Sequence, residues 1–348
     1  MKRNIDFSIY ATSKCDRNCL HCSQAVFHSQ PPAHFSKEMA EDLMESAKTY
    51  DRKITVCITG GGEPLMSPEL IPVVETFMKD SQVSQMSVIT SGFLSKNLNE
   101  KKRLENLLDL QTRNKLSLDV SFNCFNPTFP ERLHNFLRLF IKSPEIKTVT
   151  LRFCVSLTNF GKTFNDSAKV LEAFEEEFDL EIRGHMVDFG SEDFKRSLYL
   201  FNETLFKKKY LDYLTLKAYC IPTVFAIYKD SDMVKAIKVY PFPFIRNGRG
   251  RTIKDRLMGN GFYCTTMLKM DSGHLHVDFN GTYFSQCGCA QFPEMKIGEI
   301  GDNIDEVLER KSLLAQKLME KMFLSREIFP KNAIACDFCL AFMKNITF

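Results

Sequence analysis

Short apolar runs alternate with longer helical patterns over the first 160 residues, and this alternation constrains the fold more than any other feature. The apolar runs are NIDFSIYAT (4–12), ITVCIT (54–59), MSVIT (86–90), LSLDVSF (116–122) and VTLRFCVS (149–156). Helical patterns follow Ser36 and Ser67, lie near 98–110 and 129–141, and recur at 166–178. Apolar strands separated by helices are typical of a parallel sheet with helices on its outside. The number of units fits a full or partial barrel as well as an open sheet.

The later part of the chain is organised differently. Two runs, 180–188 and 234–242, compete for the sixth main strand, and the residues leave this choice open. Between them, 190–222 has the pattern of a mostly helical insertion. The run GHLHVDFNGTYFSQCGC (273–289) predicts a hairpin that turns at Asn280-Gly281, and a closing helix follows it. We therefore expect two domains, 1–250 and 251–348.

Twelve cysteines stand in a chain that shows neither a signal-peptide pattern at its start nor an apolar stretch of membrane-span length. We predict a cytoplasmic protein, in which thiols stay reduced, so clustered cysteines indicate metal or redox chemistry rather than disulfides. The net charge of +3 over 348 residues gives no electrostatic reason to expect nucleic acid or a membrane as a partner.

Three of the cysteines, Cys15, Cys19 and Cys22, lie in the loop after the first predicted strand. Three thiolates can hold three irons of a [4Fe–4S] cluster and leave the fourth iron open to another ligand. On spacing alone, a zinc site with a distant fourth ligand, or chance clustering, fits as well. The loop follows the carboxyl end of a strand, where parallel α/β proteins place their reacting groups.

A glycine-rich turn, TGGGEPL (59–65), ends the second predicted strand. Glycines there permit a close approach of the backbone to a ligand, and Glu63 can accept hydrogen bonds from an ammonium group. Such a turn alone is weak evidence. Together with the cysteine loop at the same edge of the sheet, it is strong evidence for a cofactor site.

With both motifs in place, the chain resembles the radical S-adenosylmethionine (SAM) superfamily. The matching residues are Cys15, Cys19, Cys22, His21 and the run Gly61-Gly62-Glu63-Pro64. The resemblance implies a partial (β/α)6 TIM-like barrel and a [4Fe–4S] cluster whose open iron is chelated by SAM. It also implies reductive cleavage of SAM to a 5′-deoxyadenosyl radical, which removes a substrate hydrogen. The electron would come from a flavodoxin- or ferredoxin-type reductant.

The same resemblance implies further contacts to SAM beyond Gly61, Gly62 and Glu63. His21 matches a position that packs on the adenine, and Ser91 stands where the family often has an asparagine. Ser121 matches a serine that contacts SAM, and Arg152 a basic residue that can pair with the SAM carboxylate. Cys154 shares the face of Arg152 and is the candidate catalytic hydrogen donor, with a plain core thiol as the alternative.

Four late cysteines can close a coordination sphere of their own: Cys264, Cys287, Cys336 and Cys339. They resemble the twitch domain, a shortened SPASM extension of α+β type that holds an auxiliary [4Fe–4S] cluster. Cys289 remains an alternative to Cys287, and a structural zinc fits the same four thiolates. His274 and His276 alternate on the hairpin's first strand, where we expect an exposed strand face rather than metal ligands.

Two enzyme classes agree with these features. The first modifies a peptide by epimerisation, crosslinking or oxidation. The second is a dehydrogenase or related enzyme acting on a small polar molecule such as an aminocyclitol or sugar. The first strand begins near residue 5, which leaves no room for an N-terminal peptide-recognition domain and favours the second class. A non-enzymatic zinc or iron–sulfur protein is disfavoured by the paired motifs.

Overall fold

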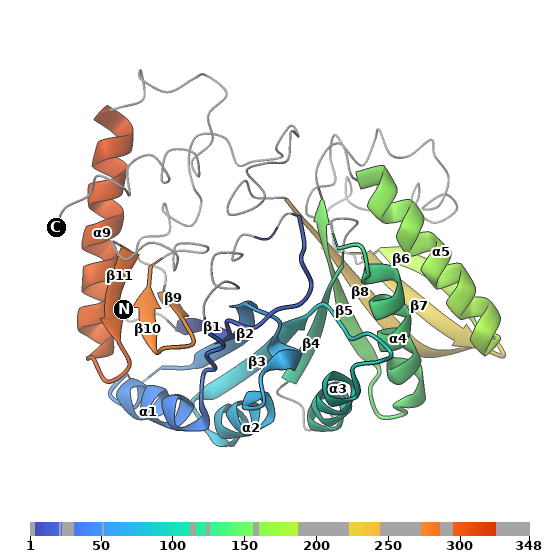
Figure 1. Ribbon diagram of the computed structural model, residues 1–348, viewed down its shortest axis with the longest axis horizontal. Helices are drawn as coiled ribbons and strands as arrows, with labels where there is room; N and C mark the ends of the chain where they lie inside the picture. The colour runs from blue at the N-terminus through green and yellow to red at the C-terminus, as the bar shows by residue number, and fades with distance from the viewer. Residues whose placement is uncertain are drawn as a thin grey trace. The chain divides into compact units, whose positions relative to one another are not determined.

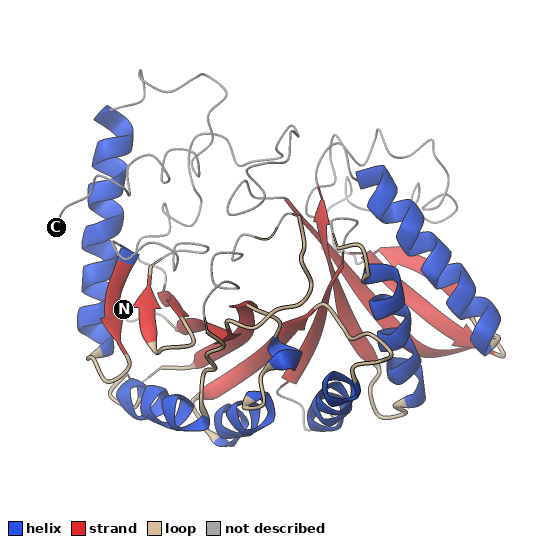
Figure 2. Ribbon diagram, in the orientation of Figure 1, coloured by secondary structure: helices blue, strands red, loops and turns tan. Residues whose placement is uncertain are grey.

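The computed structural model describes the following residues: 4–20, 22, 31–50, 52–111, 116–122, 126–155, 160–186, 223–243, 273–285 and 295–324. They form an α/β fold rich in parallel strand pairs (Figures 1 and 2). The chain divides into two compact units, one of Met1–Val88, Ile245–Ile253 and Gly259–Phe348 and one of Ile89–Phe244 and Lys254–Met258. Every helix in the described ranges is too short or too polar to cross a bilayer.

The first unit is built on six strands: β1 (Ile5–Thr12), β2 (Ile54–Gly61), β3 (Val83–Thr90), β9 (Gly273–Val277), β10 (Thr282–Phe284) and β11 (Lys296–Glu299). Their order is β11-β10-β9-β1-β2-β3. β1 pairs in parallel with β2 on one side and with β9 on the other. β9 and β10 form the predicted hairpin, and β11 continues it with a second antiparallel pair.

Helices cover one face of these strands. α1 (Lys37–Ala47) and α2 (Leu70–Lys79) pack against each other on the same side of β1 and β2 (Figure 2). Ser36 caps α1 as predicted, since its Oγ accepts a hydrogen bond from Met39 N at 3.2 Å. Alternate strand residues such as Phe7 and Val56 are buried in this apolar core. The opposite face of the same strands carries polar residues, because successive side chains alternate in direction.

The second unit contains β4 (Leu116–Phe122), β5 (Thr148–Val155), β6 (Glu181–Met186), β7 (Thr223–Lys229) and β8 (Asp232–Pro243). β5 pairs in parallel with β4 and with β8, whereas β7 is antiparallel to both β8 and β6. The sixth main strand is therefore the run at 234–242. The run at 180–188 belongs to the outer antiparallel pair, where Glu181 and Arg183 are exposed.

The helices of this unit are α3 (Leu98–Gln111), α4 (Phe129–Lys142) and α5 (Phe160–Phe178). They agree with the helical patterns of the sequence, although α5 begins six residues earlier than expected, at Phe160 rather than 166. The predicted insertion at 190–222 and the domain boundary near 250 lie outside the described residues. The division into 1–250 and 251–348, the barrel form and the twitch domain stay predictions.

Candidate metal and cofactor site

The glycine turn and the cysteine loop are direct neighbours. A Cβ on Gly62 would lie 2.0 Å from the carbonyl oxygen of Lys14, the residue before Cys15. The next amide, that of Glu63, donates to the same oxygen at 2.9 Å. Gly61 has a φ of +68° and faces the carbonyl of Thr12. Only glycine fits this contact between two backbones, which explains the glycine run at the end of β2.

The cysteine loop brings its three thiols into electrostatic range of one another. Cys15, Cys19 and Cys22 are all partly buried and are thiols rather than disulfides. The amide of Cys22 donates to the Cys19 carbonyl at 3.2 Å, and Asn18 takes a left-handed φ of 52°, so the loop doubles back. Burial is the main cause that raises the pKa of Cys15 and of Cys19 to about 12, and mutual repulsion of the thiolates adds to it.

This donor set fits an iron–sulfur cluster in its chemistry. Thiolates are the ligands that such clusters take, and a bound cation reverses the repulsion between them. Within the described ranges, no three His, Cys, Asp or Glu side chains already stand at metal-ligating distances. The three cysteines share one short loop, residues 15–22. Their role as ligands stays a prediction.

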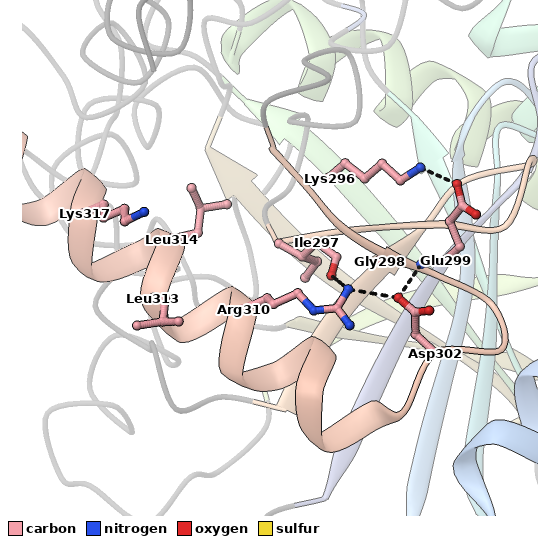
Figure 3. A pocket seen from close by; sticks show the side chains of 9 residues that line it. All are labelled: Lys296, Ile297, Gly298, Glu299, Asp302, Arg310, Leu313, Leu314 and Lys317. Atoms are coloured by element: carbon pink, nitrogen blue, oxygen red, sulfur yellow. Dashed lines mark hydrogen bonds and ion pairs between the residues drawn. The ribbon is translucent and has the colours of Figure 1, made fainter. Parts of the chain in front are cut away.

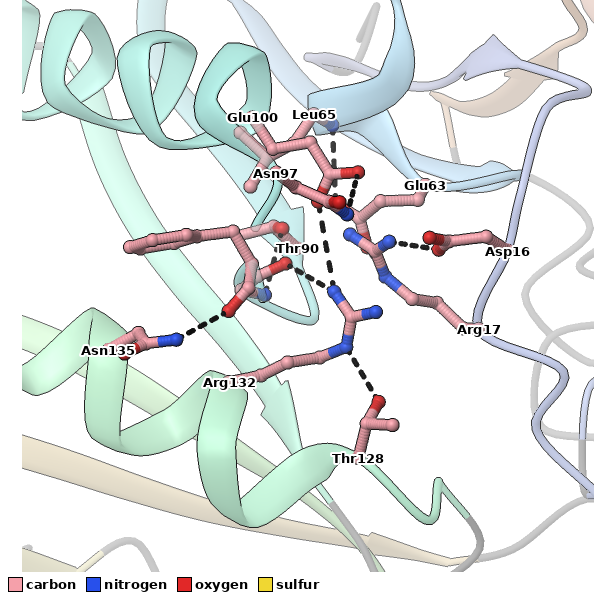
Figure 4. Close-up of polar contacts among 12 residues, drawn as sticks. Asp16, Arg17, Glu63, Leu65, Thr90, Asn97, Glu100, Thr128, Arg132 and Asn135 are labelled. Atoms are coloured by element: carbon pink, nitrogen blue, oxygen red, sulfur yellow. Dashed lines mark hydrogen bonds and ion pairs between the residues drawn. The ribbon is translucent and has the colours of Figure 1, made fainter. Parts of the chain in front are cut away.

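Charged residues of the two motifs also meet (Figure 4). Arg17, between Cys15 and Cys19 in the sequence, places its Nε 3.5 Å from Oε2 of Glu63. Both side chains are buried, at 2% and 4% exposure. Oε1 of Glu63 accepts a hydrogen bond from Leu65 N at 3.2 Å, and Arg17 also contacts Asp16. Sequence reasoning missed this pair, because it regarded Glu63 only as an acceptor for a ligand's ammonium group.

In the second unit, a buried arginine supports the segment that contains Ser91. Thr90 Oγ1 accepts from Gly92 N at 3.1 Å, and Gly92 has a φ of +75°. The carbonyl of Gly92 accepts from Nη1 of Arg132 at 3.3 Å. Arg132 is 1% exposed and lies 3.7 Å from the carboxylate of Glu100. Thr90, Gly92, Arg132 and Glu100, all residues of the second unit, are therefore joined in one set of buried polar contacts.

Arg152 lies on β5 next to Ser121 of β4, since these two residues are register partners. Its Nε and Nη2 each lie 2.6 Å from Oδ2 of Asp119, a buried residue two positions before Ser121. Asp119 thereby neutralises an arginine whose side chain remains 39% exposed. The structure thus brings together two predicted SAM contacts, Ser121 and Arg152, and adds Asp119 as the anchor of the arginine.

The expectation of an exposed face at His274 and His276 is wrong. β9 is an inner strand between β1 and β10, and the His276 ring packs against the rings of Tyr10 and His274, so that His276 is only 5% exposed. Its Nε2 lies 3.1 Å from Nε2 of His274, which also meets Ser8 Oγ at 3.1 Å. Lys311 of α9 (Ile304–Leu324) donates to the carbonyl of His274 at 2.6 Å. The local sequence pattern does not predict that His276 is buried, because the strand that packs beside it, β1, lies at the other end of the sequence.

A separate pocket of about 600 Å³ lies between β11 and α9 (Figure 3). Ion pairs neutralise its walls, since Lys296 pairs with Glu299 and Arg310 with Asp302 at 3.0 Å. As far as the described residues show, its lining contains none of the predicted site residues. We therefore do not assign the cofactor to this pocket.

Several predicted site residues fall outside the described ranges: His21, Cys264, Cys287, Cys289, Cys336 and Cys339. Cys154 belongs to β5 by its backbone, where it is the register partner of Phe242, but its side chain is not part of the description. The roles of these residues stay predictions.

Comparison with known proteins gives a family match whose range contains both the cysteine loop and the glycine turn. Residues 9–147 match the model of the Radical SAM superfamily. The "Probable GTP 3′,8-cyclase" of Methanocaldococcus jannaschii is 25% identical over 135 residues, which are 38% of this chain. The chain thus spans only 41% of the length of that curated relative.

Two solved structures are similar over most of the chain. The crystal structure of BtrN in complex with AdoMet and 2-DOIA is 14% identical, with a TM-score of 0.46 over 95% of this chain and 94% of that one. Native anSMEcpe with bound AdoMet and Cp18Cys peptide is 16% identical, with a TM-score of 0.49 over 91% of this chain and 83% of that one.

Proposed function

We propose that this chain, whose residues 9–147 match the model of the Radical SAM superfamily, is an enzyme that cleaves SAM reductively and removes a hydrogen atom from a peptide. Epimerisation, crosslinking or oxidation of the peptide would follow. The observation that carries this proposal is the contact of Gly62 with the carbonyl of Lys14, which joins the cysteine loop to the glycine turn. Two motifs that are 37 positions or more apart in sequence thus form one structural element.

Cys15, Cys19 and Cys22 would hold the [4Fe–4S] cluster, which when bound supplies one electron to the sulfonium of SAM. Gly61, Gly62 and Glu63 are the proposed partners of the amino-acid end of SAM. His21 and Ser91 are proposed as further contacts, and Cys154 as a hydrogen donor. The late cysteines Cys264, Cys287, Cys336 and Cys339 would hold an auxiliary [4Fe–4S] cluster.

Arg152 is the proposed partner of the SAM carboxylate. An arginine carries five N–H donors, and Asp119 engages Nε and Nη2. The described contacts leave Nη1 to bind an anion. Because Asp119 fixes the guanidinium, little side-chain freedom is lost when the carboxylate binds.

A small polar molecule is the second candidate substrate, and one observation favours it. Thr55, Cys57 and Thr59 are partly exposed on the face of β2 turned away from the apolar core, while Ile54, Val56 and Ile58, which alternate with them, are fully buried. Uncharged hydroxyl and thiol groups suit a polyhydroxylated ligand such as an aminocyclitol or sugar. The two candidates share the proposed hydrogen abstraction and differ in what occupies this face.

Anaerobic reconstitution tests the proposal directly. We expect about eight irons per chain, and about four after Cys15, Cys19 and Cys22 are replaced by Ala, because each cluster contains four irons. With dithionite or a flavodoxin-type reductant, the reconstituted chain should convert SAM to 5′-deoxyadenosine and the triple variant should not. Stoichiometric zinc without visible charge-transfer absorbance contradicts the proposal. Deuterium transfer from a labelled peptide or sugar into 5′-deoxyadenosine then decides between the substrate classes.

A further inference from the structure

The Arg17–Glu63 pair places two opposite charges in a buried position beside the cysteine loop. Both groups are almost completely buried, and their closest atoms are 3.5 Å apart, longer than a good hydrogen bond. Two charges taken out of water regain their solvation energy only with excellent geometry, so apolar residues would often serve packing equally well. A buried pair of this kind in a cysteine loop suggests that the charges act on something nearby.

The charges do lie beside the thiols of the loop. Arg17 and Glu63 each interact electrostatically with both Cys15 and Cys19, with opposite signs. The amide of Arg17 also donates a hydrogen bond to the sulfur of Cys15. In a buried region such interactions are screened much less than at the surface. Asp16, which also pairs with Arg17, has a side chain that is 40% exposed and is therefore screened.

We propose that Arg17 and Glu63 set the electron affinity of the iron–sulfur cluster bound by the cysteine loop. The potential of a cluster depends on nearby charge and on hydrogen bonds to its sulfurs. The cation of Arg17 stabilises the reduced, more negative cluster, and the anion of Glu63 opposes it. Arg17 is a positioning residue that acts through the cysteines, and Glu63 would act on the cluster in the same way besides its proposed contact with SAM. This inference rests on the proposed function, because it needs the cluster.

Midpoint potentials of the full-length reconstituted chain test the inference. The signal to follow in a dye-mediated EPR titration is the one that the Cys15, Cys19, Cys22 triple alanine variant lacks. Arg17→Gln should lower the potential, because it removes a buried positive charge beside the cysteines, and Glu63→Gln should raise it, because it removes a buried negative charge. Arg17→Lys keeps the positive charge, so its midpoint potential should stay near that of the wild type. Asp16→Asn is the matched control and should shift the potential less than Glu63→Gln.

The opposite signs separate this role from a structural one, since general loosening of the loop would move both variants in the same direction. Equal potentials in wild type, Arg17→Gln and Glu63→Gln, or shifts of the same sign, overturn the inference. If Arg17→Gln assembles no cluster, the potential of Glu63→Gln alone tests the inference. This variant should still fold, because the glutamine oxygen can accept the hydrogen bond from Leu65 N. If the wild-type chain itself lacks the signal, the proposed function fails, and this inference fails with it.

Discussion

Arg152 reaches across from β5 to β4 and places two of its nitrogens, Nε and Nη2, 2.6 Å from a single oxygen of Asp119. Asp119 is buried, whereas the arginine side chain is 39% exposed. The buried carboxylate of Asp119 therefore fixes the orientation of the partly exposed guanidinium of Arg152. An arginine held in this way is suited to receive a second anion with little reorganisation.

Arg152→Lys should weaken SAM binding by about tenfold or more. Lysine has a single ammonium group in place of the planar guanidinium, so it cannot bind Asp119 and a second carboxylate at the same time in this geometry. Equilibrium dialysis of labelled SAM against the reconstituted chain measures this. Arg183→Lys is the matched control, since Arg183 pairs with Glu181 at 2.5 Å on the exposed strand β6. Equal losses in both variants would speak against a specific role of Arg152.

Gly62→Ala should prevent the glycine turn from docking on the cysteine loop. The new Cβ would lie 2.0 Å from the carbonyl oxygen of Lys14, which is backbone and cannot rotate away. We expect the free energy of unfolding to fall by more than about 2 kcal/mol and the iron of the loop to be lost. Chemical denaturation and iron analysis check this.

Gly301→Ala provides the control for that substitution. Gly301 has a φ of +102°, but a Cβ there would meet nothing within 4 Å. Only the backbone strain of about 1–2 kcal/mol remains, and the iron content should stay at the wild-type level. If both variants lose iron alike, the contact with Lys14 is not what holds the loop.

The pair of Arg132 and Glu100 should be important for the stability of the second unit. Both are buried, so Arg132→Met leaves the carboxylate of Glu100 uncompensated and should lower the free energy of unfolding by about 3–5 kcal/mol. Adding Glu100→Gln should restore part of this loss. Lys101→Ala, which breaks an exposed pair with Glu105, should change the free energy of unfolding by less than about 1 kcal/mol. Urea denaturation measures all four proteins.

His276 should make the first unit sensitive to acid. Burial, the neighbouring His274 and the ammonium of Lys311 lower the pKa of His276 to about 3. Below about pH 6.5, the ordinary pKa of histidine, His276 of the unfolded chain binds a proton, whereas the buried imidazole of the folded chain stays neutral. Stability should therefore fall as the pH drops from about 6.5 towards 3, by up to about 1.4 kcal/mol per pH unit.

Urea denaturation at several pH values across this window measures the slope for wild type and for His276→Gln. The variant should show a shallower slope, because its side chain does not titrate. Above about pH 8 the imidazole is neutral in both states, so the curves should run parallel there. A slope that the substitution leaves unchanged would mean that other groups dominate the acid response.

The sequence alone predicts the elements whose signals are local. The alternation of Ile5, Phe7 and Ile9 predicts β1, the cap at Ser36 predicts the start of α1, and Asn280-Gly281 predicts the hairpin turn. The nearness of the cysteine loop and the glycine turn also follows, because parallel strands end at the same edge. These features depend on residues close together in sequence or on a general rule of the fold.

Features that depend on distant partners could not be predicted. The runs at 180–188 and 234–242 have similar patterns, and only the register of β8 with β5, Thr148 beside Ala236, decides between them. His276 looked exposed because its cover, β1, is more than 260 residues away. The pairing of Arg17 with Glu63 could not be read from the sequence, because Glu63 lies in the turn after β2, more than 40 residues away. In each case the missing information is a tertiary contact.

The parallel pairing of β1 with β9 has a consequence for the order in which the chain folds. Ile5 is the register partner of Gly273, so this edge of β1 stays unpaired until nearly four fifths of the chain has been synthesised. The strands of the second unit, by contrast, all lie within one continuous stretch and can associate earlier. Until Gly273–Val277 is available to pair, the exposed edge of β1 is a point at which aggregation can begin.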